Sequence, residues 1–368
     1  MQPKGEFFAI KTYPISSPAA NVLKQQMLAV GGECAVSRQV ITCSAEAAPV
    51  ILLGTRRQFA RLIEELEPQY FGLAKLRQDL MDFIQRLNNE GPVGIGDRVF
   101  DLDAKTYIMG ILNVTPDSFY DGGRYSSMDA AVEHALQMEA EGADIIDVGG
   151  ESTRPGASGV SQAEEMQRVV PLIEKLRQRC SVPISVDTYK SAVAQAALEA
   201  GAQVVNDISG LRFDAQLAAT VARYKATIVV MHIQGTPRDM QINPHYDNLI
   251  DEILQYLETS VTLALQAGVD TDRIIVDPGI GFGKSLEDNY TILKYLKEFK
   301  SLGYPLLVGP SRKSFIGKVL DLPPEERLEG TLAAVSVAAL NGANFVRVHD
   351  VKAAMRALKI VDTIKKAG

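Results

Sequence analysis

Short apolar runs alternate with longer amphipathic stretches along most of this chain, from about Ile108 to its carboxyl end. The short runs are rich in β-branched residues, whereas residues 193–198 and 249–257 place apolar side chains at three- and four-residue spacing. The first pattern predicts strands and the second predicts amphipathic helices. Their regular alternation is typical of repeated βα units around a parallel sheet.

We predict eight strands in this part of the chain, at residues 108–114, 144–148, 183–186, 204–208, 227–232, 274–277, 305–308 and 345–348. Eight βα units match the (β/α)8 or TIM barrel, which takes about 250 residues. A doubly wound open sheet is the alternative. Two helix starts are also predicted, because Ser285 and Asp214 each precede an amphipathic stretch and can cap its first turn.

The amino-terminal part of the chain predicts a small α/β unit. One strand begins at Phe7, a second covers residues 50–53, and two helices follow. The apolar stripes of these helices consist of Phe59, Leu62, Ile63 and Leu66 in the first and Leu76, Leu80, Phe83, Ile84 and Leu87 in the second. The stripes contain no converging polar groups, so we interpret them as core or as an oligomer contact and assign the unit no function.

The boundary between the two parts is predicted from a glycine-rich stretch. Residues 88–97 read NNEGPVGIGD, a composition typical of a linker. We therefore expect an amino-terminal extension at residues 1–95 and a barrel at residues 96–368.

Polar, charged and glycine residues recur where the predicted barrel strands end. The segments are GILNVTPDSF from Gly110, DVGGESTRPGA from Asp147, SVDT from Ser185, VDPGIGFGKS from Val276, GPSRKS from Gly309 and RVHD from Arg347. A single polar residue after a strand usually only caps the next helix. The carboxyl ends of barrel strands, however, converge on one mouth, where the active sites of such barrels lie. The candidates are Asn113, Asp147, Asp187, Asn206, Asp277, Lys313, Arg347 and His349.

Successive side chains of a strand point to opposite faces, and this predicts the direction of some of these candidates. Arg347 and His349 lie two apart, so they point the same way, and their pairing suits an anion. Asn206 and Asp207 point to opposite faces, and we expect Asn206 to face the mouth.

Three further features allow more than one interpretation. Arg154 lies in STRPGASG, which we interpret as a loop that closes over substrate, with a solvated arginine as the alternative. The stretch around Gly283 resembles a P-loop, but Pro278 occupies the position of its first glycine, and no GxGxxG follows the first strand. His134 is expected to be exposed on a helix, and His232 ends a strand with no partner visible in the sequence.

Composition narrows the classes of function. The 368 residues carry a formal net charge of −7 without a long basic run, which disfavours nucleic acid as a partner. The three cysteines, Cys34, Cys43 and Cys180, are too few for a disulfide framework or a four-ligand zinc site, so a reducing cytoplasm is expected. The amino terminus lacks a signal-type apolar core, and the apolar stretch at residues 332–340 is too short to span a membrane.

The motifs together resemble dihydropteroate synthase. MGILNVTPDSF, DVGGESTRPGA, SVDT, ND, DPGIGFGK, GPSRKSF and RVHD occur in that family's order across the predicted barrel, and the amino-terminal extension lies outside the resemblance. The resemblance implies a (β/α)8 fold. It also implies condensation of 6-hydroxymethyl-7,8-dihydropterin pyrophosphate with p-aminobenzoate to give 7,8-dihydropteroate and pyrophosphate, a step of folate synthesis that sulfonamides target.

The resemblance also implies three binding sites. Pterin would be held by Asp187, Asn206, Met231, Asp277, Lys313 and Arg347. Pyrophosphate would be held by Asn113, Arg347 and His349, with Asn113 also facing Mg²⁺. p-Aminobenzoate would be held by Thr153, Arg154, Pro155, Phe282, Lys313 and Ser314. Asn113, Arg154, Asp187, Lys313, Arg347 and His349 would carry catalysis, and Asp147 would be a supporting or a buried structural aspartate.

Carboxylates suit the adjacent N–H donors of a pterin, and a lysine can donate to its carbonyl and ring nitrogen. The implied mechanism is dissociative, and it needs no strong base because an aniline-type nitrogen is neutral at pH 7.

Two other functions remain open on the sequence. A pterin-binding methyltransferase shares the barrel but has no use for STRPGA and SRKS, which serve p-aminobenzoate and the diphosphate. A non-catalytic pterin-binding protein is opposed by the completeness of the motifs. A homodimer is what the family resemblance implies.

Overall fold

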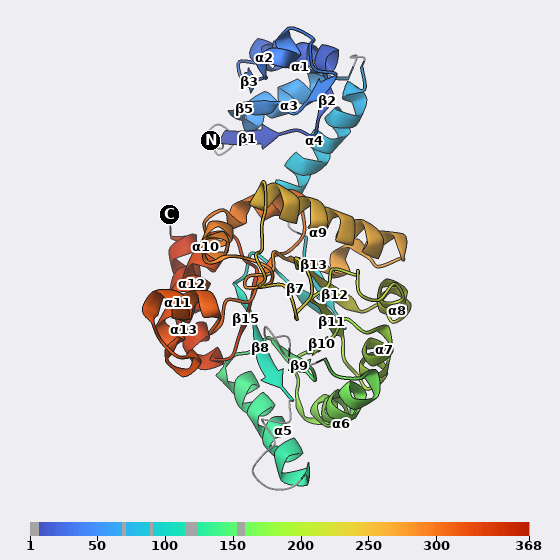
Figure 1. Ribbon diagram of the computed structural model, residues 1–368, viewed down its shortest axis with the longest axis vertical. Coiled ribbons are helices and arrows are strands. Elements are labelled where there is room, and N and C mark those ends of the chain that lie inside the picture. Colours follow the sequence, from blue (N-terminus) through green and yellow to red (C-terminus); the bar gives the residue numbers. More distant parts are fainter. Residues whose placement is uncertain (1–6, 68–70, 89–90, 115–123, 153–158, 368) are drawn as a thin grey trace. The chain divides into compact units, whose positions relative to one another are not determined.

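The structure is a computed structural model that describes residues 7–67, 71–88, 91–114, 124–152 and 159–367 (Figure 1). The chain divides into two compact units, Met1–Asn89 and Glu90–Gly368. Each unit has a hydrophobic core of its own.

The larger unit is built on eight parallel strands. They are β8 (Tyr107–Asn113), β9 (Ile145–Gly149), β10 (Ile184–Asp187), β11 (Val204–Asp207), β12 (Thr227–Met231), β13 (Ile274–Asp277), β14 (Leu307–Val308) and β15 (Phe345–Val348). Their order in the sheet is β13-β12-β11-β10-β9-β8-β15-β14. A parallel bridge between Val276 and Leu306 joins β13 to the residue preceding β14 and closes the ring. The predicted (β/α)8 barrel is confirmed, and the open sheet is excluded.

Helices surround this barrel (Figure 1). They are α5 (Arg124–Glu141), α6 (Gln162–Arg179), α7 (Ser191–Glu199), α8 (Leu217–Arg223), α9 (Leu249–Gln266), α10 (Leu286–Lys294), α11 (Ser314–Leu320), α12 (Leu328–Leu340) and α13 (Val351–Lys366). Short 3-10 turns lie at Thr271–Arg273, Leu296–Leu302 and Pro324–Glu326. The outward side chains of the strands pack against the inner faces of the helices in one continuous core.

One of the two predicted helix caps is correct. Ser285 caps α10 through a reciprocal pair with Asp288, in which each side chain accepts a hydrogen bond from the other residue's backbone N–H. The prediction for Asp214 is wrong, because α8 begins only after Gln216. The Asp214 carboxylate accepts from the backbone N–H of Gln216, ahead of α8, and from that of Ser191, the first residue of α7. Its own loop folds back to reach the preceding helix, which a local sequence pattern does not reveal.

The amino end of the barrel is closed by a hairpin. β6 (Val93–Ile95) pairs antiparallel with β7 (Arg98–Phe100), and the turn uses Gly96 at a φ of +57°. Val93, Ile95 and Phe100 are buried against inward-facing residues of the strands. The linker prediction is therefore wrong for Val93–Ile95, because alternate residues there are apolar and fill the barrel. The compact units divide at Asn89 and Glu90, ahead of the predicted boundary at residue 95.

The smaller unit combines a short antiparallel sheet with helices. Strands β1 (Phe7–Lys11), β5 (Ile51–Thr55) and β3 (Glu33–Ala35) lie in the order β1-β5-β3, and β2 (Ile15–Ser16) pairs with β4 (Ala47–Ala48). The helices are α1 (Ser17–Ala29), α2 (Arg38–Ile41), α3 (Arg56–Glu65) and α4 (Leu73–Asn88). Both predicted apolar stripes contribute to the core, through Phe59, Leu62, Leu66, Leu76 and Leu80.

Helix α1 was not predicted, although its start carries a signal. The Ser16 side chain accepts from the Ala19 N–H, and Pro18 occupies the first turn, where a missing N–H costs nothing. The helix buries Leu23 and Met27 in the core of this unit.

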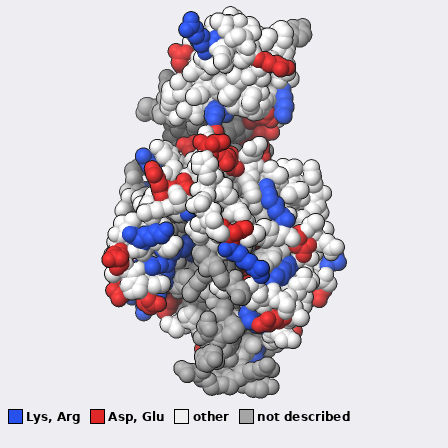
Figure 2. All heavy atoms as spheres, viewed as in Figure 1, with Lys and Arg blue, Asp and Glu red and all other residues white. Residues whose placement is uncertain are grey.

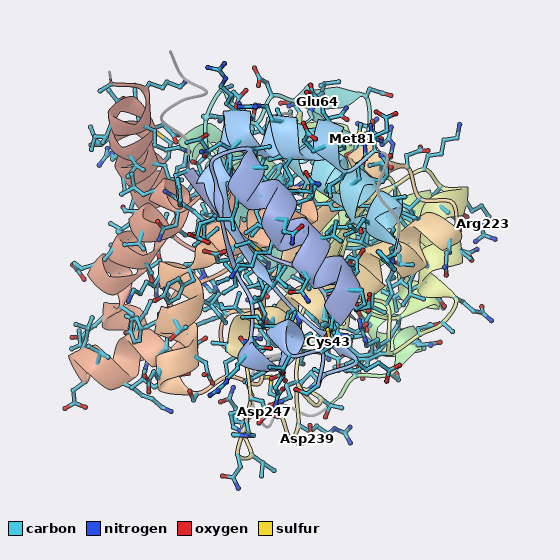
Figure 3. The ribbon with its side chains drawn as sticks, turned by 90° about the horizontal axis from the view of Figure 1, so that it is seen from above. Cys43, Glu64, Met81, Arg223, Asp239 and Asp247 are labelled. Carbon is cyan, nitrogen blue, oxygen red and sulfur yellow. The ribbon has the colours of Figure 1, made fainter. Side chains whose placement is uncertain are left out.

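The surface shows charges of both signs. On the face in Figure 2, lysines and arginines are interspersed with aspartates and glutamates. Cys43, labelled in Figure 3, is exposed, whereas Cys34 and Cys180 are buried, and all three are free thiols. Among the described residues, every helix is too short or too polar to cross a bilayer.

Candidate active site

The strands place two kinds of side chain inside the barrel. Val204, Ile145 and Phe345 lie toward the hairpin and are wholly buried in an apolar cluster. Two residues later on the same strands come Asn206, Asp147 and Arg347. Because residues i and i+2 of a strand share a face, the polar side chains point into the same barrel, one level closer to its carboxyl end.

Arg347 connects three strands in this mouth. Its Nε donates to Asp147 Oδ2 and its Nη2 donates to Asp187 Oδ2, both at 2.6 Å. Asn206 Nδ2 donates to the same Asp147 oxygen at 3.2 Å. The predicted inward direction of Asn206 is thus observed. Asp207 points to the opposite face, where its carboxylate accepts from the Ser209 and Leu211 N–H groups and closes the loop after β11.

Burial and crowding perturb the charges of these groups. Burial raises the pKa of Asp187 to about 7, although the Arg347 guanidinium acts to lower it, and the nearby Asp147 carboxylate raises it further. Burial alone would lower the pKa of Arg347, but the Asp147 and Asp187 carboxylates raise it, so the guanidinium stays charged. Asp147 Oδ1 is buried and has no hydrogen-bond partner among the described residues. Two carboxylates thus share one cation, a combination typical of a functional site.

A second cation enters the mouth from the loop that follows β14, the strand next to that of Arg347. Lys313 Nζ donates to the Ile280 carbonyl and lies 4.5 Å from the centre of the Phe282 ring. Burial lowers the pKa of Lys313 to about 8, against the raising effect of Asp277. Burial raises the pKa of Asp277, whose Oδ1 accepts from the Gly279 N–H at 2.7 Å.

The loop that carries Phe282 packs tightly on the end of β12. Gly279 has a φ of +71°, and a Cβ there would lie 1.9 Å from the His232 carbonyl oxygen. Only glycine fits such a position. At the end of β12, Met231 is buried with Ile208, Ile233 and Met240, and Phe282 packs partly buried against this group.

The remaining predicted residues lie around the rim. His349 Nδ1 lies 3.0 Å from Ser311 Oγ, which also accepts from the His349 N–H. Asn113 is exposed at the end of β8, and a Cβ at the adjacent Gly149 would lie 3.2 Å from Asn113 Oδ1. Ser314 is exposed at the first turn of α11. Thr153, Arg154 and Pro155 lie outside the described residues.

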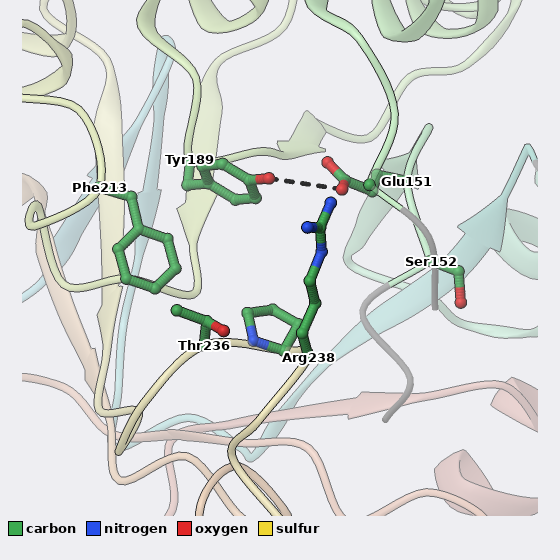
Figure 4. A pocket seen from close by; sticks show the side chains of 8 residues that line it. Glu151, Ser152, Tyr189, Phe213, Thr236 and Arg238 are labelled. Atoms are coloured by element: carbon green, nitrogen blue, oxygen red, sulfur yellow. Dashed lines mark hydrogen bonds between the residues drawn. The ribbon is translucent and has the colours of Figure 1, made fainter. Parts of the chain in front are cut away.

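A cavity of about 310 Å³ opens beside the ends of β9 to β12 (Figure 4). It is lined by Glu151, Ser152, Gly159, Tyr189, Phe213, Thr236, Pro237 and Arg238. Tyr189 meets Phe213 edge to face at 5.4 Å and donates to Glu151 Oε1 at 3.4 Å. The sequence did not single out these residues.

His232 has a partner that the sequence did not show. Its Nδ1 lies 2.8 Å from Lys284 Nζ, and Lys284 also donates to the Phe282 carbonyl at 2.9 Å. Both side chains are buried, and burial lowers the pKa of His232 to about 2 and that of Lys284 well below its usual value. This pair fixes the Phe282 loop to β12. Lys284 belongs to GIGFGKS, but His232 lies too far away in sequence for spacing to connect them.

The strand ends present carboxylates, an amide and an arginine in one barrel mouth, and Lys313 joins them from the loop after β14, an arrangement suited to an enzyme's active site. Residues 109–349 match the model of the family described as "Pterin binding enzyme", and the chain belongs to this family. The dihydropteroate synthase of Synechocystis sp. is 50% identical over 287 residues, 77% of this chain and 99% of that protein. Within the family, the chain belongs to the dihydropteroate synthases.

Two further relatives differ in how much of this chain they match. The crystal structure of Yersinia pestis dihydropteroate synthase with a sulfonamide drug superposes with a TM-score of 0.71 at 43% identity, covering 75% of this chain and all of that one. A probable bifunctional folylpolyglutamate synthase/dihydropteroate synthase of Halobacterium salinarum is 42% identical over 368 residues. That match covers 99% of this chain and 44% of the relative, so the amino-terminal unit also has a counterpart there.

Proposed function

We propose that the mouth of the barrel condenses 6-hydroxymethyl-7,8-dihydropterin pyrophosphate with p-aminobenzoate, giving 7,8-dihydropteroate and pyrophosphate. One observation carries this proposal. Asp187, Asn206 and Asp277 gather with Lys313 and Arg347 at the strand ends, and Arg347 bridges two carboxylates at 2.6 Å. Such a set of acceptors and donors matches the polar edges of a pterin and the charge of its diphosphate.

The pterin is proposed to lie between the two cations. Asp187 and Asp277 accept from its N–H groups, Asn206 hydrogen-bonds to its edge, and Lys313 donates to its carbonyl and ring nitrogen. Met231 packs beside the ring and the Arg347 guanidinium stacks on it. Support comes from burial, because Asp187, Asn206 and Asp277 are each less than a tenth exposed. Hydrogen bonds to a ligand are strongest in such a desolvated setting.

The diphosphate is proposed to bind Asn113, Arg347 and His349. Asn113 would also hold Mg²⁺ through its amide oxygen, a ligand type that this cation prefers. The described residues contain no cluster of three His, Cys, Asp or Glu side chains able to hold a metal. A single protein oxygen fits Mg²⁺, which commonly keeps several waters and takes phosphate oxygens from the substrate. When bound, the cation would neutralise charge on the leaving diphosphate.

p-Aminobenzoate is proposed to bind Phe282, Lys313 and Ser314 together with Thr153, Arg154 and Pro155. Lys313 would then face both substrates, which fits its position over the Phe282 ring. The Lys284–His232 pair holds the Phe282 loop in place from behind. A fixed wall for the aromatic ring lowers the entropic cost of aligning the two reactants.

The chemistry is proposed to rest on charge stabilisation and alignment. Departure of diphosphate from the pterin methylene leaves a cation delocalised into the ring. The neutral aniline nitrogen of p-aminobenzoate attacks this cation to form the new C–N bond and then releases one proton to solvent. Arg347 and His349 hold the departing anion, while Asp187 and Asp277 hold the pterin in place. Asp147 keeps Arg347 oriented through its 2.6 Å contact. Preorganised groups of this kind supply a large part of the rate in many enzymes.

We also propose a homodimer and a cytoplasmic location. Large apolar side chains are exposed on three helices that follow one another in the chain, namely Val319 and Leu320 on α11, Val337 and Leu340 on α12, and Ile360 and Ile364 on α13. Helix α12 packs against both α11 and α13, so these side chains belong to one region of the barrel surface. Exposed apolar patches often mark protein contacts.

The three free thiols support a reducing compartment, and hence the proposed cytoplasmic location.

The proposal is tested by a turnover assay with both substrates and Mg²⁺, following pyrophosphate and dihydropteroate together, with and without a sulfonamide. Equal release of the two products, suppressed by the sulfonamide, is the expected result. Pterin binding without release of pyrophosphate would contradict it and would point to a methyltransferase or a non-catalytic binder. A test with methyl-tetrahydrofolate and a corrinoid would separate those two.

A further inference from the structure

We propose that Lys190 is a positioning residue for the aromatic amine, because its ammonium group ties together the chain segments on both sides of residues 153–158. The inference rests on the proposed function, in which Thr153, Arg154 and Pro155 contact p-aminobenzoate. Lys190 itself lies in the loop after β10, three residues beyond Asp187.

All three N–H donors of the ammonium group are used. Lys190 Nζ donates at 2.6 Å to each of three oxygens, Glu151 Oε2, Glu165 Oε2 and the Val160 carbonyl. Glu151 stands two residues before the 153–158 segment and Val160 stands two residues after it. Glu165 lies in the first turn of α6, the helix that follows. One cation therefore connects both flanks of this segment to the end of β10.

The three side chains are withdrawn from water. Their exposed fractions are 11% for Lys190, 10% for Glu151 and 1% for Glu165. Burial raises the pKa of Glu165, and Lys190 acts to lower it. Burial would lower the pKa of Lys190, but the two carboxylates raise it, so the ammonium stays charged. An ion pair in this setting is weakly screened, and water cannot replace the missing partner when one member is removed.

Further contacts fix the same flanks. Glu151 Oε1 accepts from the Val160 N–H at 3.2 Å and from the Tyr189 hydroxyl at 3.4 Å, the second of which is drawn in Figure 4. Arg168 on α6 donates to the Gly150 carbonyl at 2.7 Å. Glu151 is thus oriented by several groups, but Lys190 alone among these reaches Glu151, Val160 and Glu165 together.

The position of Lys190 links the two substrate sites. Asp187, Thr188 and Lys190 follow one another on the same segment, and the Thr188 hydroxyl hydrogen-bonds to Glu165. The segment that presents a carboxylate to the pterin therefore also sets the register of the flanks of residues 153–158. Loss of Lys190 should misplace the aromatic amine and leave the pterin carboxylate in place.

The test compares Lys190→Met with a double variant, Lys190→Met with Glu165→Gln, which removes the buried carboxylate left unpaired by the first change. Lys190→Arg keeps the charge and serves as the rescue variant. Lys175→Met is the control, because Lys175 pairs with Asp129 on the surface. Each protein is measured for the KM of p-aminobenzoate, the Kd of dihydropterin pyrophosphate by calorimetry, and the rate of hydrogen exchange at Val160.

In both Met variants we expect the KM for p-aminobenzoate to rise about tenfold to a hundredfold, the scale of a small misplacement of a reactant. Exchange at Val160 should be faster, and the Kd for the pterin should be unchanged. Lys190→Arg should bring the KM for p-aminobenzoate part of the way back to the wild-type value. Lys175→Met should have the wild-type KM. An equal rise in the KM for p-aminobenzoate and in the Kd for the pterin substrate would overturn the inference and leave the proposed function intact. An unchanged KM in a folded double variant would do the same. A wild-type chain without condensation activity would overturn both, and exchange at Val160 would then report on the ion cluster alone.

Discussion

The two ends of the barrel are made by the same strands but have opposite chemistry. Toward the amino end, Val229, Ile275 and Phe345 interdigitate with the β6–β7 hairpin and are fully buried. Two residues further along the same strands come Met231, Asp277 and Arg347, which belong to the polar mouth or its wall. A step of two residues keeps the side chain on the inner face, so one strand can supply first a layer of core and then a layer of chemistry. The lower layer stabilises the barrel, and the upper layer is the one that we propose to bind the pterin.

The largest expected effect comes from the lower layer. Phe345→Ala removes a ring that is fully buried and stacks on Tyr107 with ring centres 5.5 Å apart. We expect the free energy of unfolding to fall by about 3–5 kcal/mol, the usual cost of such a cavity. Denaturant unfolding measures this, with Tyr295→Ala as an exposed control. The folded fraction should keep its kcat/KM, and a lowered value there would contradict the division into two layers.

The upper layer should respond to pH. The pKa of Asp187 is raised to about 7, so its carboxylate is protonated below that pH and loses its ability to accept from the pterin. The pKa of Lys313 is lowered to about 8, so its ammonium loses a proton above that pH. Affinity for 6-hydroxymethyl-7,8-dihydropterin, which lacks the titrating diphosphate, should therefore be highest between these values. It should fall about tenfold per unit on either side.

Calorimetry across this pH range checks the expectation. Asp187→Asn should remove the acidic limb and leave the basic one. A flat profile in the wild type, or an acidic limb that persists in Asp187→Asn, would show that another group controls binding.

The smallest effect is expected from removing the amino-terminal unit. A chain that starts at Gly91 keeps the β6–β7 hairpin, and its kcat/KM should match that of the full chain because every proposed site residue is retained. A chain that starts at Asp103 lacks the hairpin and exposes the lower layer, so its unfolding midpoint should drop. Folded but inactive protein starting at Gly91 would show that the extension contributes to the site or to a required oligomer.

How far the sequence predicts the structure differs between the layers. The eight strands were predictable because each is a short apolar run, most of them rich in β-branched residues, and the mouth was predictable because polar residues follow those runs. The hairpin at the other end was not, because glycines in GPVGIGD resemble a linker and Val93 and Ile95 show their role only when the barrel is closed.

Contacts between residues that are far apart in the sequence are the second feature that the sequence did not predict. Lys284 and His232 are 52 positions apart, and Lys190 and Glu151 are 39 positions apart. No local spacing connects such pairs. The sequence places these residues in or near the strand-end motifs. Only the closed barrel shows which of their side chains are in contact.

The most direct test of the central claim is the steady-state kcat/KM for dihydropterin pyrophosphate in Lys313→Met and Asp277→Asn, with the unfolding midpoint measured on the same samples. Both variants should lose orders of magnitude in kcat/KM, on the scale of about 3 kcal/mol for one lost preorganised group, while remaining folded. Kinetics like those of the wild type in both variants would contradict the assignment of the upper layer as the pterin site.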